Sequence, residues 1–209
     1  MCLNDRTALS RRPMHRKGDG MIEVRIHGRG GQGNVVAAYS LAGAAIGEGW
    51  HAQAFPAFGA ERRGAPVAAF VRMAEQPFRR RDQVAQPDFL IIQDEALLHV
   101  PGILSGLKPG GGVLVNATRE PAELGLPGPV FTVSATQLAQ EYLGRPVPNT
   151  ALLAVFLTLT ELLPVQALIT ALGARFKGKV LDANTRLIEA AAAQVPAGQW
   201  KEAMHAASA

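Results

Sequence analysis

The chain has 209 residues, of which 48% are hydrophobic and 18% are charged. These proportions are typical of a folded protein with a real core, and they exclude a disordered chain. The formal net charge is +4, but most of it lies in residues 1–20, which hold five Lys or Arg residues and two Asp residues. The small remainder gives no reason to expect a nucleic-acid partner.

Cysteine content and hydropathy exclude further classes of protein: those with internal disulfides, Cys-bound metals or membrane spans. The single cysteine, Cys2, cannot form a disulfide within the chain or by itself hold an iron–sulfur cluster or a Cys-type zinc ion. The most apolar stretch, residues 151–163, contains two threonines and Glu161 and is too short to cross a bilayer. The N-terminus lacks the apolar segment of a secretion signal. We therefore expect a cytoplasmic protein that does not contact a membrane.

Strand and helix patterns alternate along most of the chain. Residues 1–20 show almost no apolar pattern, and we expect them to form a flexible basic extension. After them, the pattern predicts strands at residues 22–27, 50–55, 67–73, 88–93, 113–116 and 129–133. It predicts helices at residues 33–47, 95–106, 148–163, 164–173 and 180–195, and one that begins after Ser134.

This order predicts a single α/β domain over residues 21–195, followed by a frayed tail at residues 196–209. We expect a Rossmann-like, mostly parallel sheet flanked by helices, with a helical C-terminal part. The run at residues 88–93 is apolar throughout, which is typical of a strand covered on both faces. The helix at residues 148–163 is apolar on nearly all sides, so this domain or a partner must bury it.

Three finer details follow from helical spacing and capping rules. The first helix is expected to bury Ile46, and the last helix is expected to bury Val180. Ser134 and Gln137 have the spacing of a capping box. Asn149 is expected to cap the helix that begins beside it rather than to bind a ligand.

A glycine loop between the first strand and the first helix is the leading candidate site. The loop consists of Gly28, Arg29, Gly30, Gly31, Gln32 and Gly33, and Asn34 begins the helix. Glycines let the backbone approach an anion closely, and the free N–H groups at the start of a helix favour negative charge. Asn116 ends a later strand, at the edge where such sheets bind ligands, although it also suits a simple turn.

The spacing Gly28-x-Gly30-x-x-Gly33 also matches the fingerprint of a dinucleotide site. An NAD site expects an acidic residue about 20 positions later, at the end of the second strand. Residues 52–56 contain no acid, and Glu61 comes too late. The alternative is that the glycines are required only for a tight turn with close packing of the helix on the sheet. Both alternatives stay open here.

A second segment places charge between two predicted strands. It contains Phe58, Glu61, Arg62, Arg63 and Gly64. Charged triplets usually lie in solvated turns, but here Phe58 and Pro66 enclose them. An arginine fork at this place suits a phosphate, or a carboxylate of a partner chain.

Together the two segments resemble the paired signatures of the gamma subunit of 2-oxoacid:acceptor oxidoreductases, the pyruvate:ferredoxin oxidoreductase family. The resemblance continues in order through residues 88–92, 108–116 and 135–139 and through Asn149 and Asn184, and it covers about residues 21–195. The indolepyruvate-type subunits usually carry a glutamine where Glu61 stands, so this chain is more similar to the ferredoxin-type subunits.

The resemblance implies an enzyme complex that oxidatively decarboxylates a 2-oxoacid to an acyl-CoA. Thiamine diphosphate and [4Fe-4S] clusters would be bound by partner subunits, and the electrons would pass to ferredoxin, or to NAD(H) through a further FAD-containing subunit. This chain would supply no catalytic residue and no metal ligand, and it would help to form the coenzyme A site and the subunit interface.

The implied site consists of the residues singled out above. Residues 28–33 would hold the phosphates of coenzyme A, and Asn34 and Asn116 would add contacts. Arg62 or Arg63 would pair with a phosphate or fix the interface, with Glu61 holding an arginine in place. Two alternatives remain at this point: a stand-alone NAD(P)-dependent dehydrogenase, and a purely structural scaffold subunit.

Overall fold

The computed structural model describes residues 20–57 and 64–201. Within them the chain forms the strands β1 (Ile22–Arg29), β2 (His51–Pro56), β3 (Pro66–Ala74), β4 (Phe89–Ile92), β5 (Gly112–Asn116) and β6 (Val130–Val133). The helices are α1 (Asn34–Gly47), α2 (Ala135–Leu143), α3 (Asn149–Thr160), α4 (Val165–Arg175) and α5 (Gly178–Ala192), with 3-10 helices η1 (Glu95–His99) and η2 (Pro121–Leu124).

The strands form one sheet in the order β2-β3-β1-β4-β5-β6. β1, β4, β5 and β6 are parallel neighbours, whereas β3 is antiparallel to both β1 and β2. Every described strand except β3 therefore runs in the same direction, so five carboxyl ends meet at one edge. The expected α/β fold with a mostly parallel sheet is confirmed.

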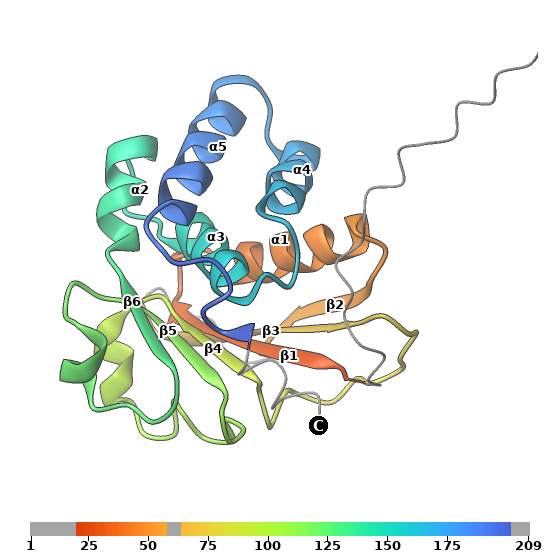
Figure 1. The fold of residues 1–209 in the computed structure, drawn as a ribbon, viewed down its shortest axis with the longest axis vertical. Coiled ribbons are helices and arrows are strands. Elements are labelled where there is room, and N and C mark those ends of the chain that lie inside the picture. The colour runs from red at the N-terminus through yellow and green to blue at the C-terminus, as the bar shows by residue number, and fades with distance from the viewer. Residues whose placement is uncertain (1–19, 58–63, 202–209) are drawn as a thin grey trace, which may run out of the picture.

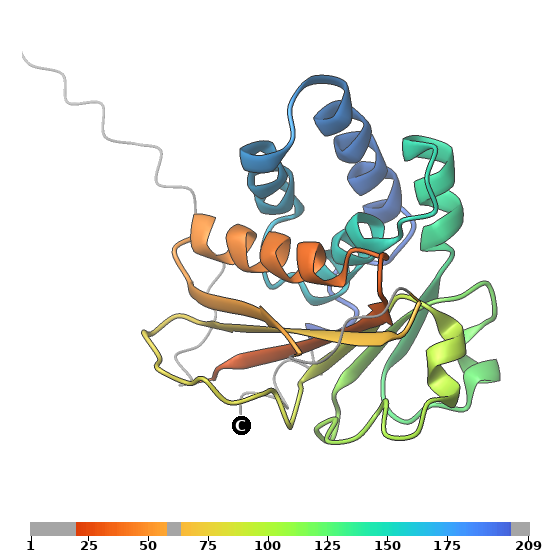
Figure 2. The ribbon, with the colours of Figure 1, turned by 180° about the vertical axis from the view of Figure 1, so that it is seen from behind.

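The five α-helices lie on the same face of this sheet (Figures 1 and 2). α1 packs on β1, β2 and β3, and α3 lies beside it and reaches β5. α4 and α5 form a further layer, because α4 packs on α1 and α5 packs on α3. The short helices η1 and η2 lie on the opposite face of the sheet (Figure 1), and η2 packs on β6.

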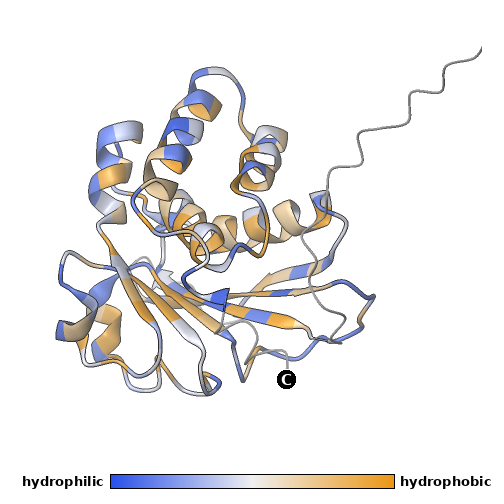
Figure 3. Ribbon diagram, in the orientation of Figure 1, coloured by the Kyte–Doolittle hydropathy of each residue, from blue (hydrophilic) through white to orange (hydrophobic). Residues whose placement is uncertain are grey.

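The core explains why two segments are apolar throughout. In β4, Phe89 and Ile91 belong to the cluster under the α-helices, and Leu90 and Ile92 belong to the cluster on the η side. In α3 every residue except Thr158 is buried, as expected for a helix enclosed between the sheet and a second helical layer. Figure 3 shows mostly apolar colouring along β4, β5 and α3, whereas β1 is interrupted by hydrophilic segments. This domain therefore buries α3.

The first part of the expected frayed tail is ordered instead: residues 196–201 pack against the domain, whereas residues 202–209 lie outside the described residues. Trp200 is 2% exposed, and its ring stacks on Phe89 with centroids 5.9 Å apart. Phe89 in turn meets Phe156 of α3 edge to face, at 5.3 Å. The Trp200 N–H donates to the Leu159 carbonyl at 2.8 Å, so the segment is fixed at the end of α3.

The helix expected at residues 95–106 is wrong beyond its first turn. Only η1 forms, with its first turn capped by Asp94, whose side chain accepts a bond from the Ala96 N–H. Turns follow η1, because Pro101 has no N–H to donate and Gly102 and Gly106 adopt positive φ angles of 81° and 76°. Leu97 is fully buried on this side of the sheet, so packing sets the shape of the segment.

Three finer expectations are also wrong. Ser134 makes no side-chain cap bond; the Asn116 Oδ1 accepts the Thr136 N–H instead, at 3.1 Å. Ile46 is 58% exposed and Val180 is 53% exposed. Ile46 lies in the last turn of α1 and Val180 in the first turn of α5, where neighbouring elements no longer cover every apolar position.

Candidate functional site

The glycine loop lies at the point where the chain leaves the sheet in two directions. From β1 the chain passes through α1 on one face to β2, and from β4 it passes through η1 on the other face to β5. The carboxyl ends of β1 and β4 are neighbours. In open α/β sheets this switch point is where ligands bind.

Two glycines give the loop its shape. Gly31 and Gly33 have φ angles of 97° and 81°, which residues with a side chain rarely adopt. Gly33 precedes α1, and no side chain caps this helix. As in any α-helix, the first N–H groups of α1 lack intrahelical acceptors, and they give this end a partial positive charge. Because no described side chain accepts from them, this charge is available to a ligand.

Hydrogen bonds within the glycine loop fix its conformation. The Arg29 N–H donates to the Gln32 Oε1 at 2.7 Å, and the Gln32 N–H donates to the Arg29 carbonyl at 3.0 Å. A Cβ on Gly28 would lie 2.2 Å from the Asn34 Oδ1, so Gly28 is required by packing. The loop is preorganised before any ligand arrives.

Arg29 joins the glycine loop to two other segments, in an arrangement we term the Arg29 clamp. Its Nε donates to the Asp94 Oδ2 at 2.5 Å, and its Nη1 donates to the Gly64 carbonyl at 3.2 Å. The backbone adds two bonds, from the Gly30 N–H to the Ala65 carbonyl and from the Gly64 N–H to the Gly30 carbonyl. The connection between β2 and β3 therefore returns to the glycine loop.

Both sequence motifs thus meet at the switch point. Gly64 has a φ of 81° and bonds to the loop directly. The other predicted residues of the second motif, Phe58, Glu61, Arg62 and Arg63, lie outside the described residues. Their placement beside the glycine loop stays a prediction, which rests on the bonds that the following residues, Gly64 and Ala65, make to Gly30.

The asparagines expected to contact a ligand have partners inside the protein. Asn34 is 4% exposed, and its Nδ2 donates to the Val67 carbonyl at 3.0 Å. The Asn116 Nδ2 donates to the Gln93 carbonyl and to the Thr136 hydroxyl, at 2.9 and 2.7 Å. Asn34 therefore connects α1 to β3, and Asn116 connects β5 to β4 and α2. A ligand contact by either residue stays a prediction.

Asn149 is the first residue of α3 rather than its cap. Its Oδ1 accepts the Thr150 N–H at 2.8 Å, and its Nδ2 lies 3.4 Å from the Gly33 carbonyl. A Cβ on Gly33 would lie 2.6 Å from the same Nδ2. Asn149 therefore connects the start of α3 to the start of α1.

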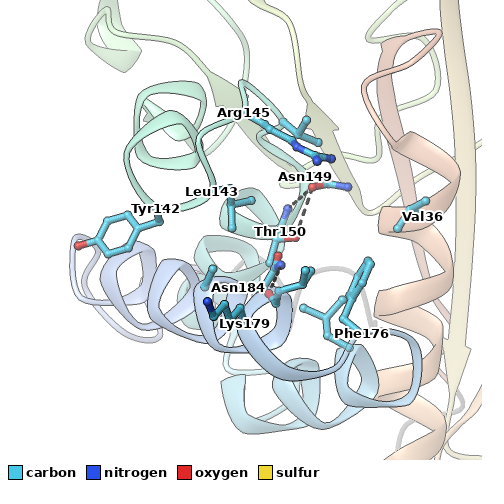
Figure 4. A pocket seen from close by; sticks show the side chains of 13 residues that line it. Val36, Tyr142, Leu143, Arg145, Asn149, Thr150, Phe176, Lys179 and Asn184 are labelled. Carbon is cyan, nitrogen blue, oxygen red and sulfur yellow. Dashed lines mark hydrogen bonds between the residues drawn. The ribbon is translucent and has the colours of Figure 1, made fainter.

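A cavity of about 340 Å³ opens beside this connection, among all five α-helices (Figure 4). We call it the helical pocket. Its polar lining includes Arg145, Asn149, Lys179 and Asn184, and its apolar lining includes Val36 and Phe176. The sequence analysis missed it, because its walls come from residues far apart in the chain and are not marked by a motif.

His27, directly before the loop, stays neutral at physiological pH. Burial, with a smaller contribution from Arg25, lowers the pKa of its imidazole to about 3. Its Nε2 accepts the Arg25 Nε–H at 2.9 Å. Within residues 20–57 and 64–201, no group of three or more His, Cys, Asp and Glu side chains is placed to hold a metal ion.

A family model excludes one of the alternatives. Residues 23–194 match the family model described as pyruvate ferredoxin/flavodoxin oxidoreductase. The chain belongs to this family. Since the match covers most of the chain, the predicted resemblance is confirmed, and the interpretation as a stand-alone NAD(P)-dependent dehydrogenase is wrong.

Relatives specify the type of subunit. Pyruvate synthase subunit PorC of Methanothermobacter marburgensis is 48% identical over 78% of this chain and 92% of its own length. The common gamma subunit of the pyruvate/ketoisovalerate oxidoreductases of Thermococcus kodakarensis is 43% identical over 82% of this chain and 95% of its own length. This chain is therefore a gamma subunit of a 2-oxoacid:ferredoxin oxidoreductase complex.

Solved structures share the fold. The pyruvate oxidoreductase subunit PORC of Thermotoga maritima gives a TM-score of 0.75 at 35% identity, covering 83% of this chain and 96% of that chain. A 2-oxoglutarate:ferredoxin oxidoreductase of Magnetococcus marinus was solved with 2-oxoglutarate, coenzyme A and succinyl-CoA bound. It gives a TM-score of 0.68 at 22% identity. That likeness covers 85% of this chain but 32% of the longer one.

None of the helices in the described part of the gamma subunit combines the length and apolarity needed to cross a bilayer.

Proposed function

We propose that this gamma subunit helps to form the coenzyme A site, and part of the subunit interface, of an oxidoreductase that converts a 2-oxoacid to an acyl-CoA. One observation carries the proposal: a preorganised glycine loop and an uncapped helix N-terminus lie together at the switch point of the sheet. The diphosphate of coenzyme A has the charge that such a site favours.

Gly31 gives the loop an open side. Among residues 20–57 and 64–201, a Cβ at Gly31 would meet no atom within 4 Å, whereas one at Gly28 or Gly33 would meet Asn34 or Asn149. A phosphate can therefore approach the backbone at Gly31 without displacing any of these described residues. In this proposal residues 28–33 and Asn34 hold the diphosphate of coenzyme A.

The remaining chemistry belongs to partner subunits. Cys2 is the single cysteine of this chain, so this chain cannot by itself hold a [4Fe-4S] cluster. In this proposal the clusters and the thiamine diphosphate are bound by partner subunits. Those cofactors decarboxylate the 2-oxoacid and carry its electrons to ferredoxin, or to NAD(H) through an additional flavin subunit. Residues 58–64 supply interface or phosphate contacts, and Asn116 supplies a further polar contact.

The test uses the assembled oxidoreductase carrying Gly31→Val in this subunit. The new side chain fills the space in front of the loop, and we expect the KM for coenzyme A to rise at least about tenfold, the loss of one charge-assisted contact or more. The coenzyme A-independent first reduction of the enzyme by its 2-oxoacid should be largely retained. Gly125→Val is the matched control, because Gly125 also has a positive φ and open space but caps η2 on the other face.

Three outcomes separate the alternatives. A raised KM for coenzyme A in Gly31→Val alone supports the proposal. An equal loss of both half-reactions makes the loop structural and favours the scaffold interpretation. An unchanged KM for coenzyme A in a complex that still assembles contradicts the proposed site.

A further inference from the structure

We infer that one side of this subunit docks on another subunit of the oxidoreductase complex, which adds a short extended strand to β2. This side, the α1–β2 flank, consists of Tyr39 and Ile46 of α1 and of Ala52 and Ala54 of β2. The inference rests on the interface part of the proposed function, and it does not use the coenzyme A site.

The α1–β2 flank belongs to a stretch of sequence that is almost free of charge. Residues 30–60 contain a single Lys, Arg, Asp or Glu residue, Glu48, although 18% of the whole chain is charged. α1 itself has no charged residue, whereas the exposed side of α5, for example, carries Lys179 and Asp182. A helix that faces water normally has a charged or polar side. The outward side of α1 is therefore suited to burial against protein.

Two large apolar side chains are exposed on this side of α1. Tyr39 is 52% exposed and Ile46 is 58% exposed, and their spacing of seven residues places them on the same side of the helix. Toward its helical neighbours, α1 presents Val36 to the helical pocket and Gly43 to Ala171 of α4. Because α3 lies on the β5 side of α1, Tyr39 and Ile46 lie on the flank toward β2, at the edge of the sheet (Figures 1 and 2).

β2 offers unpaired backbone groups along the same flank. Among the described residues it pairs on one side only, with β3. The Ala57 N–H donates to the Ala68 carbonyl, and successive residues of an antiparallel strand direct their backbone groups to opposite sides. Ala52 and Ala54 therefore direct theirs away from β3. Pro56 is the next residue in this outward series, and it ends the series because it has no N–H to donate.

These features favour another subunit as the occupant of the flank. Exposed sheet edges commonly carry charged residues that prevent pairing with other chains, and β2 carries none. The buried centres of protein interfaces are depleted in charge and enriched in aromatic residues, which describes this flank. A gamma subunit has partner subunits. β2 also runs toward the edge of the sheet where Ala65 bonds to the glycine loop, so a subunit docked here would reach the candidate site.

The first test measures amide hydrogen exchange in the assembled oxidoreductase. The outward N–H groups of Ala52 and Ala54 should exchange at least about tenfold more slowly than in an unstructured peptide of the same sequence, because a partner strand covers them. Rapid exchange of both groups in the intact complex overturns the strand pairing. A complex whose gamma subunit lacks residues 2–19 should keep the protection, and its loss would mean that this chain's own N-terminal segment covers the edge.

The second test measures how tightly this subunit binds the rest of the complex. Tyr39→Lys and Ile46→Lys should each weaken that binding about tenfold or more, because each variant places a charge in an apolar contact. The matched control is Val180→Lys, since Val180 is 53% exposed on α5 and lies outside the flank. Binding is read from the amount of gamma subunit that copurifies with a tagged partner subunit over a dilution series.

The outcomes separate this docking surface from the proposed function. Equal weakening in Val180→Lys, or no weakening in either α1 variant, overturns the docking surface. A dimer of this chain that the α1 variants abolish would make a second copy the occupant and overturn the assignment to another subunit. If the α1 variants assemble normally while Gly31→Val still raises the KM for coenzyme A, only the docking surface fails. If Arg63→Glu also assembles normally, the interface part of the proposed function fails with it.

Discussion

Gly28 is the position of the glycine loop at which an added methyl group has the sharpest structural consequence. Gly28 has no positive φ, so its backbone accepts alanine. The new Cβ would lie 2.2 Å from the Asn34 Oδ1 and 2.9 Å from the Asn34 Cγ. Gly28→Ala must therefore displace the Asn34 side chain and break its bond to the Val67 carbonyl.

The cost follows from that one displaced side chain. The Asn34–Val67 hydrogen bond contributes about 1 kcal/mol, and leaving its buried groups without partners adds about 1–3 kcal/mol. Gly28→Ala should then destabilise the chain by about 2–4 kcal/mol. For a domain of this size that corresponds to a fall in Tm of about 4–16 °C.

A double-mutant cycle isolates this mechanism. Asn34→Ala removes the atoms that the new methyl group would meet, so adding Gly28→Ala to it should cost almost nothing or stabilise slightly. The free energy of unfolding of the four proteins is measured by urea titration followed by circular dichroism. Gly47→Ala is the control, because Gly47 ends the same helix in open space.

One outcome of the double-mutant cycle would contradict this mechanism. If Gly28→Ala costs as much in the Asn34→Ala background as it does alone, the two positions are not coupled. Gly28 would then be required for another reason, and the packing of α1 on the loop would not depend on Asn34.

Three further predictions test other parts of the structure. Exchanging the charges of Arg29 and Asp94 should cost less stability than the sum of the two single changes, because the exchange keeps an ion pair, and thermal unfolding without such coupling would contradict the Arg29 clamp. Trp200→Ala should cost about 3–5 kcal/mol, because it empties a buried site against Phe89, and an unchanged unfolding midpoint would refute this packing. Because the folded-state pKa of His27 lies near 3, below its unfolded value, unfolded chains bind a proton first as the pH falls. Stability should therefore decline from about pH 6.5 toward pH 3, by at most about 1.4 kcal/mol per pH unit, and His27→Gln should reduce that slope in an acid series of urea titrations.

The sheet and the glycine loop were predictable because their signals are local. Continuous apolar residues mark β4 and β5, which are covered on both faces. Glycines at residues 28–33 mark a turn with positive φ angles between a strand and a helix. Each of these features depends on neighbours in sequence, which a single chain displays directly.

The details that were missed depend on distant residues. The cap of α2 comes from Asn116 on β5 and not from Ser134 beside it. Trp200 is buried because Phe89, far away in the sequence, offers a flat partner. Asp94 follows a buried strand at the carboxyl edge, a signal that could have paired it with Arg29. No comparable signal marks the helical pocket, because five helices must pack before it exists.

The position of Trp200 also bears on the synthesis of this subunit. Phe89 is synthesised long before Trp200, so the growing chain carries an uncovered aromatic surface until Trp200 emerges from the ribosome. Closure of the core therefore waits for Trp200, and a nascent chain stalled before this point exposes an apolar surface to chaperones or to other nascent chains.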